Sequence, residues 1–247
     1  MATSHSPKQN RILAGLPPAD YARLLPHLEL VCIPPGEGIY EPGMHITHLY
    51  FPIDCIVAWI GELASGAAFQ TAIAGNEGMA GLSYLLGCEN AHARAVVLSG
   101  GSAFRIKASL LKKEFESGGA LQRLLLRFTR ALMVQTTLLA VSARHYSIEQ
   151  QLCHFLLMCL DRLSGSELSI TQQQLSIFLG ARRESITVVA QKLEITGAIH
   201  SRRGHLTVVN RQELEFRAGE SYAVVCKEYQ YLQEYEVPSN ATRTCFS

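Results

Sequence analysis

Several features that define other protein classes are absent or scarce in this chain of 247 residues. Its charge is nearly balanced, with 22 Lys and Arg against 21 Asp and Glu, which excludes a uniformly basic protein. No run of about 18 apolar residues occurs, so we expect no membrane span. Residues 1–8 lack an apolar secretory core, so we expect no export signal and a cytoplasmic location.

Cysteine pairing and catalytic motifs are also missing. The seven cysteines include no C-x-x-C pair, and their odd number argues against a disulfide framework or a zinc knuckle. There is no P-loop and no dinucleotide fingerprint, so we expect neither an enzyme nor a bound metal or fixed cofactor. What the chain does have is an apolar share of 48%, which is enough to bury a core and excludes a disordered protein.

The first part of the chain, residues 1–118, reads as short strands separated by turn residues. Apolar stretches lie at 30–33, 39–40, 49–51, 55–60, 68–73, 94–99 and 103–106, separated by turns such as Pro34-Pro35-Gly36. Strands of this length, with a turn about every ten residues, predict an antiparallel β-roll or jelly roll. A short helix is expected before them, at 17–28.

A long helix is predicted over residues 119–145. Its apolar side recurs at alternating steps of four and three, which is an a/d pattern. The residues in this seam are Leu121, Leu125, Phe128, Leu132, Gln135 and Leu139. Such a seam can pack on its own domain. It can also form a parallel contact between two copies of the chain, which is our prediction, with Gln135 fixing the register.

The most specific pattern begins at Thr171, in the third part, residues 146–247. Thr171 and Gln174 form a capping box for a short helix that Gly180 ends. A second helix is predicted at about 183–196, and Gly197 suits the left-handed position after it.

Two short strands then flank the basic turn at residues 201–205. Two helices joined by a tight turn and followed by a two-stranded wing are typical of a winged helix-turn-helix, whose second helix enters the DNA major groove. Residues 211–236 are expected to form one further amphipathic helix, and the last residues, from Pro238, to be loose.

The residue types on this unit suit DNA. Arg bonds guanine bidentately and Glu accepts from cytosine, while basic residues at a wing tip contact phosphates. Between Glu167 and Arg211 there are six basic and three acidic residues, an excess of three. The candidate DNA-binding residues are Thr171, Gln172, Arg182, Arg183, Glu184, Thr187, Val188, Gln191, Lys192, Arg202 and Arg203.

The segment from Thr171 to Val209 resembles the DNA-binding domain of the CRP/FNR family of bacterial transcription regulators. The order of the three parts matches that family over nearly the whole chain. Arg183 and Glu184 match the usual opening of its recognition helix, but Val188 stands where the family has a polar reader. The resemblance implies an α+β fold of β-roll sensor, dimerisation helix and winged helix-turn-helix. It also implies a homodimer that binds palindromic DNA, with RNA polymerase as a further partner.

The resemblance is weaker in the sensor pocket. Relatives that bind a cyclic nucleotide hold its ribose with a Gly-Glu pair and its phosphate with an Arg followed by Ser or Thr. Here Glu77 and Gly78, with Arg94 and Ala95, are the candidate effector residues. Asn76 replaces the Gly and no Ser or Thr follows Arg94, which argues against cyclic AMP. Another nucleotide-type effector, a different ligand, a sensor domain that binds nothing and one that meets a protein all stay open.

Two other functions remain as alternatives. One is a ligand sensor whose DNA-binding part is vestigial. The other is a metal enzyme on the β-roll, where Glu41, His45 and His48 cluster. Their His-x-x-His spacing on a turn differs from the His-x-His of jelly-roll enzymes, and a polar turn is the simpler interpretation.

Overall fold

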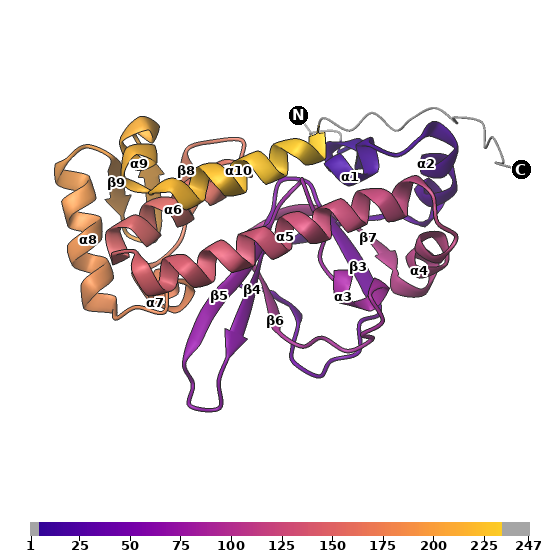
Figure 1. The fold of residues 1–247 in the computed structure, drawn as a ribbon, viewed down its shortest axis with the longest axis horizontal. Coiled ribbons are helices and arrows are strands. Elements are labelled where there is room, and N and C mark those ends of the chain that lie inside the picture. The colour runs from indigo at the N-terminus through magenta and orange to yellow at the C-terminus, as the bar shows by residue number, and fades with distance from the viewer. Residues whose placement is uncertain (1–4, 234–247) are drawn as a thin grey trace, which may run out of the picture.

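The computed structural model describes residues 5–233. Helix α5 (Ala120–His145) runs along the length of the molecule, with the β-roll on one side of it (Figure 1). The helix-turn-helix unit lies at one end, and helix α10 (Glu220–Gln233) lies alongside α5. The three-part order expected from the sequence is therefore confirmed.

The β-roll consists of two antiparallel sheets, and all seven predicted strands are present. The first sheet has the order β1-β7-β3 and the second has the order β2-β6-β4-β5. The strands are β1 (Glu29–Ile33), β2 (Gly38–Tyr40), β3 (His48–Pro52), β4 (Ile56–Glu62), β5 (Ala68–Ala74), β6 (Arg94–Ser99) and β7 (Gly101–Lys107). Alternating apolar residues such as Phe51, Ile73 and Ile106 are fully buried, as a sheet packed on one face requires.

Short helices surround the sheets. The helix expected at 17–28 is observed as α2 (Pro18–Leu24), continued by one 3₁₀ turn (Leu25–His27). Helices α1 (Arg11–Ala14), α3 (Leu82–Leu85) and α4 (Ala108–Glu116) were not predicted. Two of them are a single turn long, too short for periodicity to reveal.

The prediction that the α5 seam forms the contact between two copies of the chain is wrong for most of the seam residues. Leu121, Leu125, Phe128 and Gln135 are all buried within the subunit and cannot meet a second copy. The side-chain oxygen of Gln135 accepts a hydrogen bond from Ile73 N on β5 at 2.8 Å, and its nitrogen donates to the hydroxyl of Tyr229 on α10 at 3.2 Å. An a/d pattern reports one apolar face of a helix, and here the β-roll and α10 cover that face.

Helix α5 also bears on the membrane prediction. Within residues 5–233 it is the one helix that has the length and composition of a membrane span, with a mean hydropathy of 1.4 over 18 residues. The sequence from Ala131 to Ala143 contains no charged residue. Of that 18-residue window, 28% is buried within the subunit, where α5 packs on the β-roll and α10.

The third part follows the predicted order. Helices α6 (Ile148–Leu160), α7 (Gln172–Phe178) and α8 (Arg183–Ile195) precede strands β9 (Ile199–Arg202) and β10 (His205–Val208). Strand β8 (Glu167–Ser169) pairs with β10, so the wing sheet has three strands.

The single helix predicted after Asn210 is two helices. Asn210 caps α9 (Arg211–Arg217), and α10 starts at Glu220. Between them Gly219 has φ +76°, a left-handed conformation that an uninterrupted helix cannot contain. The predicted end of that helix and the loose tail lie outside the described residues.

Candidate nucleic-acid interface

Helices α7 and α8 are fixed by local signals in the sequence. The Thr171 hydroxyl accepts from Gln174 N at 3.2 Å, and the Gln174 side chain accepts from Thr171 N at 2.9 Å, so the predicted capping box is present. Gly180 has φ +58° in the turn, and Gly197 has φ +69° just after α8. Both glycines therefore end their helices as expected.

The predicted reading face of α8 is exposed. Arg183, Glu184, Val188 and Gln191 are solvent-accessible, whereas Ile186, Ala190 and Leu193 on the opposite face are buried. Val188 is 65% exposed, although burial would be expected for an apolar side chain without a partner. The helix thus presents polar groups together with the methyl groups of Val188 and, at its end, Ile195 to the outside.

Three predicted DNA contacts have other partners in the structure. The Thr187 hydroxyl donates to Gln172 at 2.8 Å, which joins α8 to α7. The Lys192 ammonium lies 2.5 Å from a carboxylate oxygen of Glu149 on α6. The hydrogen bond between these two groups is the main factor that lowers the pKa of Glu149. Gln172, Thr187 and Lys192 therefore brace the unit in this arrangement.

The remaining basic residues are available to an anionic partner. Among residues 5–233, no carboxylate lies within ion-pair distance of Arg182, Arg183, Arg202 or Arg203. Arg203 and Gly204 form the tip of the wing, between β9 and β10. The wing is tied to α8 because Glu194 accepts from Ser201 N at 3.2 Å. Arg202 donates to His200 Nε2 at 3.2 Å. Guanidinium groups without a carboxylate partner at the wing suit phosphate contacts.

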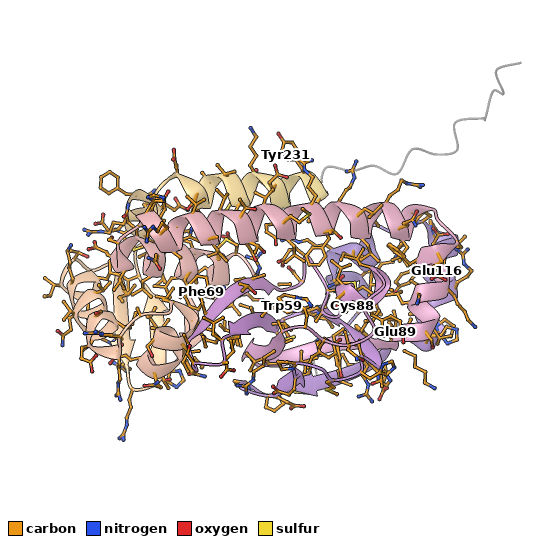
Figure 2. The ribbon with its side chains drawn as sticks, turned by 60° about the horizontal axis from the view of Figure 1, so that its bottom comes forward. Trp59, Phe69, Cys88, Glu89, Glu116 and Tyr231 are labelled. Atoms are coloured by element: carbon orange, nitrogen blue, oxygen red, sulfur yellow. The ribbon has the colours of Figure 1, made fainter. Side chains whose placement is uncertain are left out.

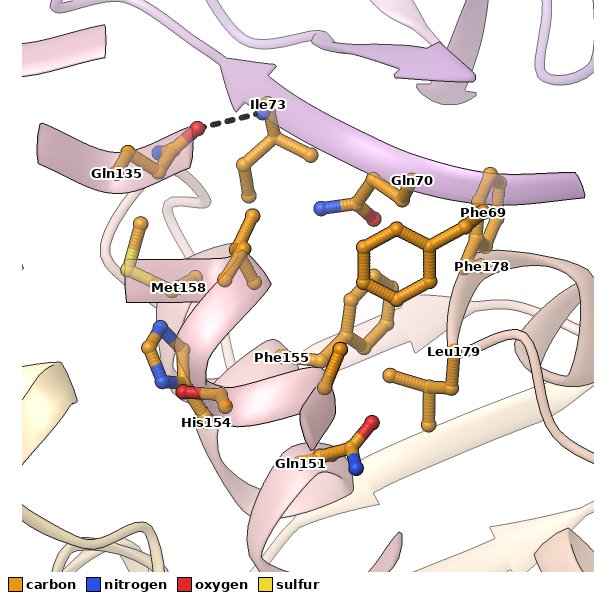
Figure 3. A pocket seen from close by; sticks show the side chains of 13 residues that line it. Phe69, Gln70, Ile73, Gln135, Gln151, His154, Phe155, Met158, Phe178 and Leu179 are labelled. Atoms are coloured by element: carbon orange, nitrogen blue, oxygen red, sulfur yellow. Dashed lines mark hydrogen bonds between the residues drawn. The ribbon is translucent and has the colours of Figure 1, made fainter. Parts of the chain in front are cut away.

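Strand β5 connects the β-roll to this unit. Figure 2 shows Phe69 at the boundary between the two, and a Cβ atom added to Gly180 would lie 3.2 Å from its ring. Figure 3 shows Phe69 and Gln70 facing the side chains of His154 and Phe155 on α6. The turn of the helix-turn-helix therefore rests directly on the sensor.

The candidate effector residues do not form one site. Glu77 is buried and its carboxylate pairs with Arg162, just beyond α6, at 2.7 Å. Arg94 pairs with Glu41 at 3.3 Å. A Cβ atom added to Gly78 would lie 2.3 Å from the ring of Phe128, so no ligand fits there, and Ala95 is fully buried. The predicted pairing of Glu77 with Arg94 around a nucleotide is wrong because each already has another partner.

A different hollow of about 510 Å³ lies between the β-roll and α5. Trp59 and Thr71 line it from β4 and β5, Ser83 lines it from α3, and Leu132 and Thr136 line it from α5. We call it the sensor pocket. Sequence reasoning missed it because its lining residues are far apart in the chain and share no local motif.

The metal-enzyme alternative receives no support from the side-chain positions. Glu41 is engaged with Arg94, and His48 lies beside Thr47 and β7. Within residues 5–233, no group of three His, Cys, Asp or Glu side chains is placed to hold a metal ion.

Comparison with known proteins agrees with this geometry. Residues 150–217 match the family model of the Crp-like helix-turn-helix domain. None of the curated proteins compared with the chain matches it significantly.

Solved structures share the fold over most of the chain. A protein described as a transcriptional regulator of the CRP/FNR family from Eubacterium rectale has a TM-score of 0.67 at 17% identity, covering 85% of this chain and 99% of its own. FixK2 from Bradyrhizobium japonicum has a TM-score of 0.67 at 17% identity, covering 78% and 98%. The c-di-GMP responsive regulator CLP from Xanthomonas campestris has a TM-score of 0.59 at 19% identity, covering 77% and 98%. The chain thus contains a Crp-like helix-turn-helix domain and shares its overall fold with regulators of the CRP/FNR family.

Proposed function

We propose that the protein binds a palindromic DNA site as a homodimer, with α8 of each subunit in the major groove. The observation that carries this proposal is the exposed face of α8, with Arg183 and Glu184 at its start and Gln191 two turns on. Arg183 suits guanine, Glu184 suits cytosine, and Val188 suits a thymine methyl group. Arg202 and Arg203 of the wing contact flanking phosphates.

The outer face of α5 supports the homodimer. Leu126, Met133, Thr137 and Ala140 are exposed at steps of seven, four and three residues, with Leu126 at 50% and Met133 at 66%. This face lies away from the buried seam. A partly apolar helix face with heptad spacing is suited to a parallel two-helix contact. Two recognition helices would then lie about one DNA turn apart.

Control by an effector is part of the proposal. The sensor pocket is lined by Leu132 and Thr136, next to Met133 and Thr137 of the outer face on the same helix. A ligand there would change the position of α5 and bias the dimer between two arrangements, with a coupling of about 1–3 kcal/mol. RNA polymerase is the further partner that we propose, and the cytoplasm is the compartment.

The test is selection of genomic DNA fragments by the purified full chain at fixed, near-physiological salt, followed by sequencing. The expected result is a palindrome with half-sites about 10–11 base pairs apart. A variant with both Arg182→Ala and Arg183→Ala is the matched control and should enrich no motif. Failure of the wild-type chain to enrich any motif, alone or with a panel of nucleotides and uncharged small molecules, would favour a sensor with vestigial DNA binding.

A further inference from the structure

We propose that the sensor pocket takes an uncharged, largely apolar small molecule and not an anionic nucleotide. The inference rests on the proposed effector control and names the class of ligand. The pocket, at about 510 Å³, is in the size range of sites for small organic ligands. Figure 2 shows Trp59 within the β-roll, and its indole forms part of the pocket wall together with Leu82 and Leu132.

The pocket lacks what a phosphate requires. None of the described residues that line it is Arg or Lys, and the one carboxylate among them is that of Glu62. Arg94 follows the lining residue Ala93, but it is paired with Glu41 at 3.3 Å. An anion would lose hydration in a pocket whose described lining holds no Arg or Lys, and it would lie near the Glu62 carboxylate, so its binding is disfavoured.

The polar groups that line the sensor pocket favour a ligand that has one polar end on an apolar body. The Tyr40 hydroxyl already donates to His48 O at 2.6 Å, and the Thr71 hydroxyl donates to Trp59 O at 3.3 Å. Within the described chain, no hydrogen bond or ion pair involves the side chains of Ser83 and His92. These two side chains can orient a hydroxyl or carbonyl group, while the indole and the aliphatic residues contact the apolar part.

Trp59 makes the proposal measurable, because it is the only tryptophan in the sequence. The probe is N-phenyl-1-naphthylamine, an uncharged aromatic dye that absorbs where tryptophan emits. Titration of the full chain should give saturable energy transfer from Trp59 with a dissociation constant of about 10–100 μM. Cyclic AMP and c-di-GMP at millimolar concentration should neither displace the dye nor change Trp59 emission.

Ala93→Phe places a ring in the pocket and should weaken dye binding at least tenfold. Ala22→Phe makes the same change on the exposed surface of α2 and should leave dye binding unchanged. If Ala93→Phe lowers the thermal midpoint, Thr136→Phe on α5 fills the pocket from the other side. The proposal is overturned if the dye gives no saturable transfer, if the pocket variants bind it as tightly as wild type, or if either nucleotide displaces it. Because these readouts use no DNA, they are independent of whether the proposed DNA binding holds.

Discussion

Arg162 and Glu77 form a buried ion pair that joins the DNA-binding unit to the β-roll. Their charged atoms lie 2.7 Å apart, and the side chains are only 4% and 5% exposed. Arg162 also donates to Met158 O at 2.7 Å, and its guanidinium lies 4.9 Å from the centre of the Tyr229 ring on α10. The β-roll, the end of α6 and α10 therefore meet at one charge, which helps to fix their relative orientation.

Removal of one partner of this pair should be strongly destabilising. Arg162→Met leaves the Glu77 carboxylate buried without a counter-charge, and we expect a loss of about 3–5 kcal/mol in the free energy of unfolding. Urea denaturation measures it. The double variant Glu77→Gln/Arg162→Met should lose much less than the sum of the two single variants. Additive losses would mean that the pair contributes no coupling.

Base reading and phosphate contact should be separable. Arg183→Ala should weaken binding to the selected site by about 1–3 kcal/mol and relax the preference at one base position. Arg203→Ala should weaken binding to all DNA sequences alike. It should also reduce the slope of log affinity against log salt concentration by about one. Competition between the selected site and unrelated DNA at several salt concentrations distinguishes the two kinds of contact. An unchanged sequence preference in Arg183→Ala would show that the assigned reading face of α8 is misplaced.

The outer face of α5 should control assembly. Met133→Glu places a charge in the proposed two-helix contact and should shift the protein to the monomer, as measured by sedimentation equilibrium. Ser109→Glu, which adds the same charge on the exposed surface of α4, is the control and should leave the mass unchanged. If the Met133→Glu protein sediments as the wild type does, the dimer contact does not involve this face of α5.

His154 should make stability depend on pH below neutrality. Burial, and next the charge of Arg162, lower the pKa of His154 from 6.5 to about 4. Between these values the unfolded chain binds a proton that the folded chain does not, so stability falls as pH decreases. We expect a loss of about 2 kcal/mol from this group between pH 7 and pH 5. The urea midpoint should change less between pH 7 and pH 5 in His154→Gln than in the wild type. An equal change in both proteins would exclude His154 as the source of the pH dependence.

The break between α9 and α10 should not tolerate a side chain. A Cβ atom at Gly219 would lie 2.9 Å from the ring of Tyr146, and the residue has φ +76°. Gly219→Ala should therefore cost about 2–4 kcal/mol. Gly204→Ala has a similar φ of +79° but open space around it, so it should cost about 1–2 kcal/mol. Thermal unfolding compares the two variants. Equal losses of stability would show that the contact with Tyr146 makes no steric contribution.

The elements that depend on local signals could be predicted from the amino-acid sequence. The capping box of Thr171, the glycines at 180 and 197, and the alternation of short strands with turns each act within a few residues. They were sufficient to define the winged helix-turn-helix, the β-roll and the long helix. The exposed positions of Arg183 and Arg203 follow from the same short-range periodicity.

Which helix and sheet faces pack against one another could not be predicted in this way. The periodicity of α5 marks an apolar stripe but not what covers it, and β5 and α10 cover it within the subunit. Glu77 and Arg162 are 85 residues apart in sequence, so no local pattern could pair them. The sensor pocket likewise assembles from β4, β5, α3 and α5. Long-range partners depend on how completed elements pack, and that information lies in the folded core rather than in any single segment.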